Sequence, residues 1–243
     1  MAGRLGGLYR RATTGPTYPP DAGDLADVHL FGLAFPLRAS VAVLVTTAII
    51  VVDQLRWVVP DGAGALPGVE PLAQARLGLF LGVPILVIVL GFRDQPGRYA
   101  LRVGDWRWGV ALLVAGLLVM TPIILGLAQV ESFRGYYGAA TEPLGGRLLN
   151  SLVELIPAEF LLRGFLMFAL WRRIGPLALV VVQIPFVLTH IGKPEIELWS
   201  TFVGGAIFAW LDWRTGSILW SALGHVYVMT LMLVAVGGAS LGG

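Results

Sequence analysis

The chain has no cysteine and few charged residues. Of its 243 residues, 13% are Asp, Glu, Lys or Arg and 56% are hydrophobic, and the mean hydropathy is +0.78. A soluble protein carries roughly 25% charged residues, so these charges cannot cover a surface that faces water. The lack of cysteine excludes a disulfide framework, thiolate catalysis and cysteine-ligated metals. The composition therefore predicts an integral membrane protein whose main partner is lipid.

Concentrated basic charge is also lacking. Seventeen basic and fifteen acidic residues give a net charge of +2, and the only lysine is Lys193. The arginines are scattered between apolar runs, whereas nucleic-acid binding needs a basic patch or stripe, so no nucleic-acid partner is expected. Residues 1–30 lack the apolar core of a signal peptide. We interpret them as a mobile cytoplasmic tail.

Long apolar runs fill the rest of the chain. A bilayer core needs roughly 20 apolar helical residues to cross it, and helices satisfy their own backbone groups there. Residues 31–243 are therefore predicted to form one all-α transmembrane bundle of about seven spans. The runs are 37–55, 77–92, 108–129, 148–171, 174–190, 196–211 and 215–237. The sixth run is short, so six spans with this run re-entrant is the alternative.

The flanks of these runs predict an orientation. With seven spans, eleven Arg or Lys residues fall on the side of the N-terminus and five on the other side. Cytoplasmic flanks carry the excess of such residues. We therefore expect a cytoplasmic N-terminus and an external C-terminus. Abundant Ala, Gly and Arg with one Lys favour a bacterial cytoplasmic membrane.

Three apolar runs contain ionisable residues that are costly in a bilayer and usually functional. Glu159 and Arg163 are four residues apart and so share one helical face; the alternative is an ion pair that only fixes packing. His190 ends the fifth run and His225 lies midway along the seventh. One Glu with two imidazoles is a set that activates water or holds a metal such as zinc. A polar intramembrane cavity is therefore expected.

The motif region, residues 151–231, resembles a known family. It contains Glu-x-x-x-Arg-Gly at Glu159, Phe-x-x-x-His ending at His190, and Thr-Gly-Ser-Ile shortly before His225. This order is similar to the CPBP family, the CAAX-prenyl-protease and bacteriocin-processing intramembrane proteases also called Abi proteins. The resemblance implies a helical bundle in which Glu159 and His190 activate water and His225 assists as a ligand or as an oxyanion stabiliser. A peptide or lipidated peptide would be the substrate.

Two positions depart from the family pattern. The family's first motif begins with two glutamates, and the first of them, usually assigned as the general base, is Ala158 here. The third motif often has Asn four residues after its histidine, where this chain has Met229. Glu154 lies four residues before Ala158, so it projects from the same face one turn away and is a candidate replacement base. The alternative is that Glu154 is simply solvated near the outer interface.

Three functions remain open. The first is an intramembrane metallopeptidase, with Glu159, His190 and His225 around a divalent ion or a water molecule. The second is a catalytically silent relative that binds a membrane partner, which the residues at 158 and 229 favour. The third is a proton-coupled transporter, because intramembrane Glu, Arg and His also relay protons. No duplicated half-sequences of the transporter kind are present. The sequence does not indicate an oligomeric state.

Overall fold

Helices dominate the computed structural model, which describes residues 14–60, 62, 64–138, 142–237 and 239–240. The strands form only a short antiparallel hairpin and a two-residue parallel pair. This confirms the predicted all-α class. In chain order the elements are α2 (Ala22–Leu25), β1 (Asp27–Leu30), β2 (Leu33–Pro36), α3 (Leu37–Gln54), α4 (Pro71–Arg76), η1 (Leu77–Gly82), α5 (Val83–Leu86), η2 (Val87–Gly91), η3 (Pro96–Tyr99), α6 (Trp106–Leu127), α7 (Glu131–Tyr137), β3 (Glu142–Pro143), α8 (Leu144–Glu159), η4 (Phe160–Leu166), α9 (Met167–Ile174), α10 (Leu177–Val181), α11 (Gln183–Leu188), α12 (Glu195–Thr215), α13 (Leu219–Ala235) and β4 (Ala239–Ser240).

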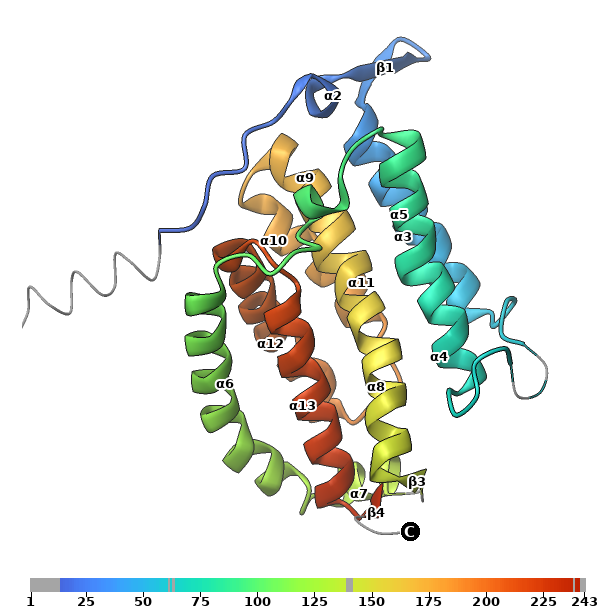
Figure 1. The fold of residues 1–243 in the computed structure, drawn as a ribbon, viewed down its shortest axis with the longest axis vertical. Helices are drawn as coiled ribbons and strands as arrows, with labels where there is room; N and C mark the ends of the chain where they lie inside the picture. The colour runs from blue at the N-terminus through green and yellow to red at the C-terminus, as the bar shows by residue number, and fades with distance from the viewer. Residues whose placement is uncertain (1–13, 61, 63, 139–141, 238, 241–243) are drawn as a thin grey trace, which may run out of the picture.

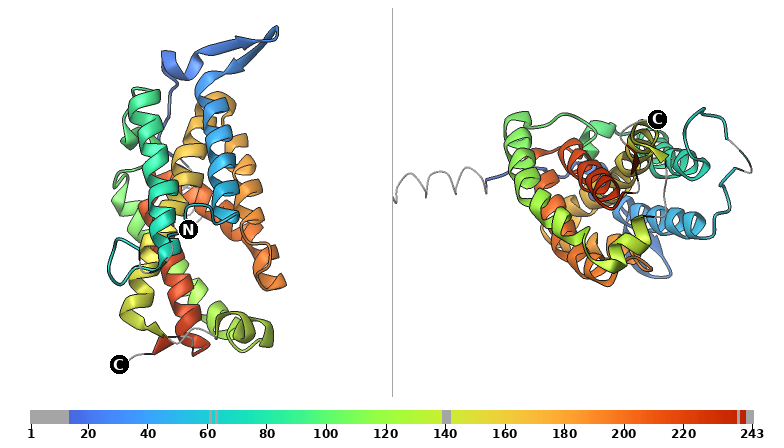
Figure 2. Two further views of the ribbon diagram at one scale, coloured as in Figure 1. Left: turned by 90° about the vertical axis from the view of Figure 1, so that its right-hand side faces the viewer. Right: turned by 90° about the horizontal axis from the view of Figure 1, so that it is seen from below.

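The main helices stand side by side along one axis (Figure 1). Elements α4 to η2 follow one another without a break, as do α8, η4 and α9, so each set forms one long rod. Successive rods run in opposite directions, and α2 and the β1–β2 hairpin lie at the opposite end from β3 and β4 (Figures 1 and 2). We call these the N-terminal end and the C-terminal end of the bundle.

Three helices within the described residues are long and apolar enough to cross a membrane: Leu37–Gln54, Pro71–Gly91 and Trp106–Leu127. Most residues of these helices are not buried inside the bundle. In the apolar 18-residue stretch of α6, only 6% of the residues are buried. Their apolar side chains face outward, which is the arrangement of a helix in contact with lipid. The total of seven spans stays a prediction.

The fifth and sixth apolar runs differ in length from the prediction. Helices α10 and α11 together cover only residues 177–188, about 18 Å of helix, which is less than the roughly 30 Å of a bilayer core. Helix α12 is longer than expected because Pro194 precedes a first turn that contains Glu195 and Glu197. Acidic side chains stabilise the N-terminus of a helix. The short element is therefore the fifth run, and the sixth is a full-length helix.

The rod of α8, η4 and α9 forms the centre of the bundle. Every residue from Glu159 to Leu170 is buried, and Phe160, Leu161 and Phe165 are fully buried in the main hydrophobic core. A helix that is apolar on all sides must be surrounded by other elements. Any ionised side chain on this rod must therefore find its partner inside the protein.

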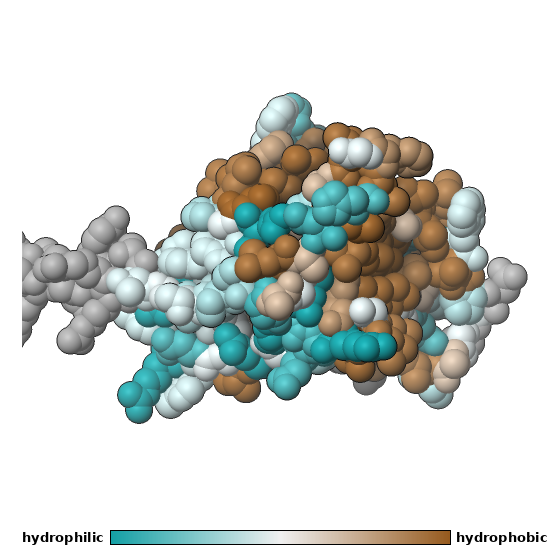
Figure 3. Space-filling view, turned by 90° about the horizontal axis from the view of Figure 1, so that it is seen from above, coloured by the Kyte–Doolittle hydropathy of each residue, from teal (hydrophilic) through white to brown (hydrophobic). Residues whose placement is uncertain are grey.

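The N-terminal end is closed by ion pairs around Asp24, which is 4% exposed. Its carboxylate accepts hydrogen bonds from Arg38 Nη1 at 2.9 Å and Arg98 Nη2 at 2.8 Å, and it lies 3.7 Å from Arg172 Nε. These contacts join α2 to α3, η3 and α9. The described part of the predicted tail, residues 14–30, thus packs on this end, whereas residues 1–13 lie outside the described residues. Hydrophilic residues gather on this face beside a broad hydrophobic area (Figure 3).

Candidate active site

Glu159 is the last residue of α8 and lies in the middle of the central rod. Its side chain is 1% exposed. The next seven residues, Phe160–Leu166, are π-helical. Such turns are rare in proteins, and those that do occur often lie at functional sites. Pro157 lies inside α8 just before this point and has no backbone N–H for the α-helical ladder. The sequence thus places a buried carboxylate at a local irregularity of the most buried helix.

Arg163 pairs with Glu159, as their spacing predicts. Its Nη1 donates a hydrogen bond to Glu159 Oε2, and both side chains are 1% exposed. The guanidinium carbon lies 4.0 Å from the ring centre of Phe186 and 5.5 Å from that of Phe208. Among the described residues, Nε and Nη2 of Arg163 have no hydrogen-bond partner. One carboxylate and two aromatic faces therefore compensate this buried cation.

His225, on α13, contacts the other oxygen of the same carboxylate. Its Nδ1 donates a hydrogen bond to Glu159 Oε1 at 2.6 Å. Because an ionised carboxylate only accepts, Nδ1 carries the proton of this hydrogen bond, and in the neutral form of such a ring Nε2 has a free lone pair. An acid that orients an imidazole in this way is found in catalytic triads. The structure thus brings Glu159 and His225, 66 residues apart, into one hydrogen-bonded pair.

His190 lies in the turn that follows α11 and has a different partner. Its Nδ1 donates to the backbone carbonyl of Phe186 at 2.8 Å. The Phe186 ring lies between the two histidines, with its centre 4.7 Å from the ring centre of His190 and 6.1 Å from that of His225. His190 therefore shares the aromatic surroundings of the pair but is not bonded to Glu159. Its Nε2 also has a free lone pair.

Glu159, His190 and His225, the expected metal ligands, are not arranged as a metal site. A catalytic zinc site uses three protein ligands. Here both oxygens of Glu159 are already bonded, to Arg163 and to His225. No group of three or more His, Asp or Glu side chains suited to a metal ion occurs in the described part of the chain. As placed, these residues offer two imidazole nitrogens and no third ligand.

Glu154 is held away from the Glu159–His225 pair. Arg76 donates a hydrogen bond to Glu154 Oε1 through Nη1 and binds both carboxylate oxygens of Asp53 at 2.9 Å. The Glu154 side chain is 30% exposed, so this acid is ion-paired at the edge of the bundle. The hydrogen bonds that the structure gives it connect α8 to α3 and α4 and do not lead to Ala158.

Asp212, near the end of α12, is a buried acid that the sequence analysis missed. It is 0% exposed, and Ser221 Oγ donates to its Oδ2 at 2.9 Å. Its Oδ1 has no hydrogen-bond partner among the described residues. Asp212 interacts electrostatically with Glu159 and Arg163. Its signal in the sequence is an acid that directly follows the predicted apolar run 196–211.

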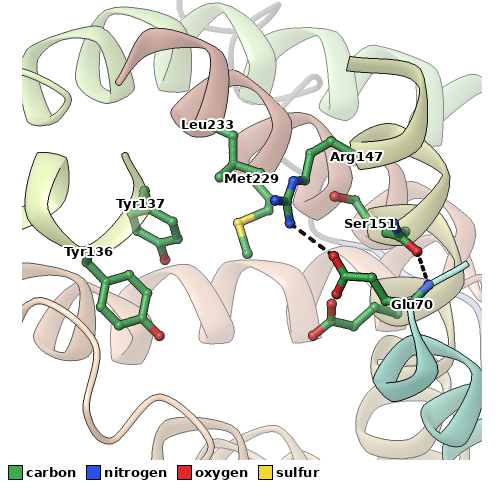
Figure 4. A pocket seen from close by; sticks show the side chains of 9 residues that line it. Glu70, Tyr136, Tyr137, Arg147, Ser151, Met229 and Leu233 are labelled. Carbon is green, nitrogen blue, oxygen red and sulfur yellow. Dashed lines mark hydrogen bonds and ion pairs between the residues drawn. The ribbon is translucent and has the colours of Figure 1, made fainter. Parts of the chain in front are cut away.

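A pocket of about 200 Å³ opens between α7, α8 and α13 toward the C-terminal end. Tyr136 and Tyr137 come from α7, Ser151 from α8, and Met229 and Leu233 from α13 (Figure 4). Glu70, Arg147, Asn150 and Glu154 complete its lining. Met229 follows His225 by four residues on α13, and its side chain points into this pocket (Figure 4). Glu159, His190 and His225 are not among the residues that line this pocket, so the polar intramembrane cavity stays a prediction.

Comparisons with known proteins give one match. Residues 140–231 match the family described as type II CAAX prenyl endopeptidase Rce1-like. No curated protein and no solved structure matches the chain. The matched segment contains Glu159, Arg163, His190 and His225, and the apolar helices support an integral membrane protein. The match over this segment supports an assignment to the CAAX-type intramembrane proteases.

Proposed function

We propose that this protein hydrolyses a peptide bond in a membrane-embedded or lipidated peptide, using water that the Glu159–His225 pair activates. The observation that carries this proposal is the 2.6 Å hydrogen bond from His225 Nδ1 to Glu159 Oε1 inside the bundle. It leaves His225 Nε2 as a base whose orientation is fixed by a buried carboxylate. A base positioned in this way contributes roughly 10²–10⁴-fold to a hydrolytic rate.

The proton follows a short path in this mechanism. His225 Nε2 accepts a proton from water while the water oxygen attacks the peptide carbonyl carbon. Glu159 remains ionised and stabilises the imidazolium that forms. When the C–N bond breaks, the imidazolium gives its proton to the leaving nitrogen. The hydroxyl of the water ends in the new carboxyl group, and the water's proton ends on the new amine.

Arg163 and His190 have supporting roles in the proposal. Arg163 keeps Nε and Nη2 without a hydrogen-bond partner among the described residues, so it is our candidate donor to the developing oxyanion. His190 Nε2 accepts a hydrogen bond from the attacking water. No step uses a metal ion, because the placed side chains do not supply a third ligand.

Hydrolysis of a defined peptide tests the proposal. The purified protein in detergent is given a farnesylated peptide that ends in Cys-aliphatic-aliphatic-any residue, and release of the last three residues is measured. We expect turnover by the wild type and a rate roughly 10²–10⁴-fold lower for Glu159→Gln, which keeps the shape of the side chain but removes its charge. A chelator is expected to leave the rate unchanged. Loss of activity that added zinc restores would overturn the metal-free form of the mechanism.

The second candidate function is that of a catalytically silent relative, which binds a membrane partner without cleaving it. Ala158 and Met229 stand where the family has a carboxylate and an amide, so the site has fewer polar groups. Under this function the wild type retains the peptide without cleaving it. A proton-coupled transporter is the third candidate, and it would instead show solute flux in proteoliposomes.

Glu154→Gln is expected to slow hydrolysis by less than about tenfold, which is roughly 1.4 kcal/mol of barrier. The reason is that Arg76 binds Glu154 at the edge of the bundle, so Glu154 does not serve as the base. The measurement is the rate relative to Glu159→Gln in the same assay. If Glu154→Gln were as slow as Glu159→Gln, and Ala158→Glu restored the rate, Glu154 would be the borrowed base.

We propose that the N-terminal end of the bundle faces the cytoplasm. Eight of the eleven Arg residues predicted on this side fall within the described residues, and the other three, Arg4, Arg10 and Arg11, lie outside them. A reporter enzyme fused after Gly243 that works only outside the cytoplasm should therefore be active. Cytoplasmic activity of the fusion would mean that one of the apolar runs does not cross.

A further inference from the structure

The Glu159–His225 pair needs a path for water and peptide, and the described residues at the N-terminal end of the bundle are packed against one another. Tyr18 packs on Phe168 with ring centres 4.9 Å apart, and its hydroxyl donates to the backbone carbonyl of Trp213 at 2.6 Å. Beside it, the backbone of Ile218 donates to the carbonyl of Ala100 at 3.1 Å. Two chain segments, residues 14–24 and 92–105, thus lie across the ends of α9 and α12 and the start of α13. This end is closed by packed backbone and side chains.

The pocket between α7, α8 and α13 lies on the other side of the pair. Met229 and Leu233 follow His225 at intervals of four residues on α13, so all three lie on one helical face. Ser151 precedes Glu159 by eight residues on α8, with the buried Leu155 between them on the same face. At 1.5 Å per residue, Met229 lies about 6 Å from His225 along the helix axis and Ser151 about 12 Å from Glu159. The pocket therefore lies one turn of α13 from His225 and about two turns of α8 from Glu159, and neither residue of the pair is part of its lining.

Met229 is the lining residue nearest to His225 along α13. It lies one turn from His225, and its side chain points into the cavity (Figure 4). Ser221 lies one turn from His225 in the opposite direction and is 0% exposed, with its hydroxyl bonded to Asp212. The two turns of α13 that flank His225 thus differ: one lines a pocket and the other is sealed.

We infer that this pocket is a peptide-binding subsite through which the substrate reaches Glu159 and His225 from the C-terminal end of the bundle, with Met229 as the wall next to the scissile bond. The inference rests on the proposed function and adds the direction of access. It also makes Met229 a residue that determines specificity, because its flexible thioether side chain decides how far a substrate side chain extends toward His225.

The lining of the pocket fits the end of a peptide that leaves the bilayer. Met229, Leu233 and the rings of two tyrosines form an apolar wall (Figure 4). Asn150, Ser151 and Glu154 are among the residues of a second, polar wall. Sites for organic ligands combine such apolar surface with a few polar groups that fix orientation. Apolar side chains of an extended peptide pack on the first wall, while its backbone amides bond to the second.

Thiol labelling tests this inference, because the natural chain contains no cysteine. Met229→Cys and Ser151→Cys place a thiol in the pocket, and Ser221→Cys is the matched control one turn beyond His225 on the sealed side. Each variant also carries Glu159→Gln, so that the peptide binds without being cleaved. Equal melting temperatures establish that the variants fold. The probe is a charged, water-soluble methanethiosulfonate, with and without the farnesylated peptide.

We expect Met229→Cys and Ser151→Cys to react roughly tenfold or more faster than Ser221→Cys, because a thiol in a packed core reacts only through local opening. Saturating peptide should slow the labelling of the two pocket variants and leave Ser221→Cys unchanged. Equal rates in all three variants would overturn the inference. So would protection by peptide at Ile184→Cys, on the exposed face of α11, without protection at Met229→Cys, since this would mean lateral access from the lipid.

The labelling experiment can fail or succeed independently of the test of the proposed function. Labelling and protection are read in a background without turnover, whereas the function depends on peptide release by the wild type. Fast labelling that peptide does not slow would show a water-filled pocket that peptide does not occupy, and would overturn the subsite while wild-type hydrolysis stood. Protection without any wild-type hydrolysis would keep the subsite and favour the silent relative.

Discussion

Glu159→Gln, His225→Ala and the double variant are expected to lose nearly the same amount of hydrolysis, each falling roughly 10²–10⁴-fold below the wild type. The two side chains share one hydrogen bond of 2.6 Å. Residues that act as one unit are strongly non-additive, because once one is lost the other has nothing left to contribute. The measurement is kcat for the three variants on the same peptide.

His29→Ala is the matched control for this comparison. It makes the same substitution in β1, where His29 is exposed at the N-terminal end and far along the chain from the motifs. Its kcat should equal that of the wild type. If the losses of Glu159→Gln and His225→Ala instead multiplied in the double variant, the two residues would act in separate steps. The hydrogen bond between them would then be structural.

The sequence predicted the pair of Glu159 and Arg163 because a spacing of four residues fixes a common helical face. It predicted the class and the positions of the main helices because apolar composition decides both in a membrane protein. The predicted lengths of the fifth and sixth runs were wrong, because the ends of these helices are not set by apolar composition. Pro194 with two following glutamates extends α12, whereas α10 and α11 together end at Leu188, before His190.

The contact between His225 and Glu159 could not be predicted from residue spacing. It joins residues 66 positions apart on different helices. Only the resemblance to a family indicated that the three motifs meet. The same resemblance grouped His190 with them, and the structure places His190 nearby with a backbone carbonyl as its partner. Which ring nitrogen bonds to which acceptor is decided by packing.

The sequence gives only a weak indication of two features of the structure, the buried Asp212 and the ion pairs around Asp24. Asp212 is one acid beside an apolar run, and its burial follows from the contact of α12 with Ser221 on α13. The cluster around Asp24 joins the N-terminal segment to arginines 14, 74 and 148 residues further along the chain. These arginines counted toward membrane orientation in the sequence. The structure shows that several of them also hold a segment across the end of the bundle.

Arg163→Ala is expected to lower the free energy of unfolding by about 3–5 kcal/mol, because it leaves the carboxylate of Glu159 buried without its cation. Both side chains are 1% exposed, so water cannot replace the lost partner. The measurement is denaturant or thermal unfolding in detergent, where the midpoint should fall on the order of 10 °C. His225 alone compensates less, because it supplies a single hydrogen bond to the carboxylate.

Arg163→Met separates the lost charge from the lost volume. Methionine keeps most of the side chain against Phe186 and Phe208, so a destabilisation close to that of Arg163→Ala assigns the effect to the charge. Adding Glu159→Gln to Arg163→Met removes the uncompensated carboxylate and should recover stability, because replacing both members of a buried pair is often neutral. If the double variant is no more stable than Arg163→Met alone, or if Arg163→Ala melts like the wild type, Arg163 does not compensate Glu159. The carboxylate would then depend on His225, and the pair proposed for catalysis would also be the one that stabilises the fold.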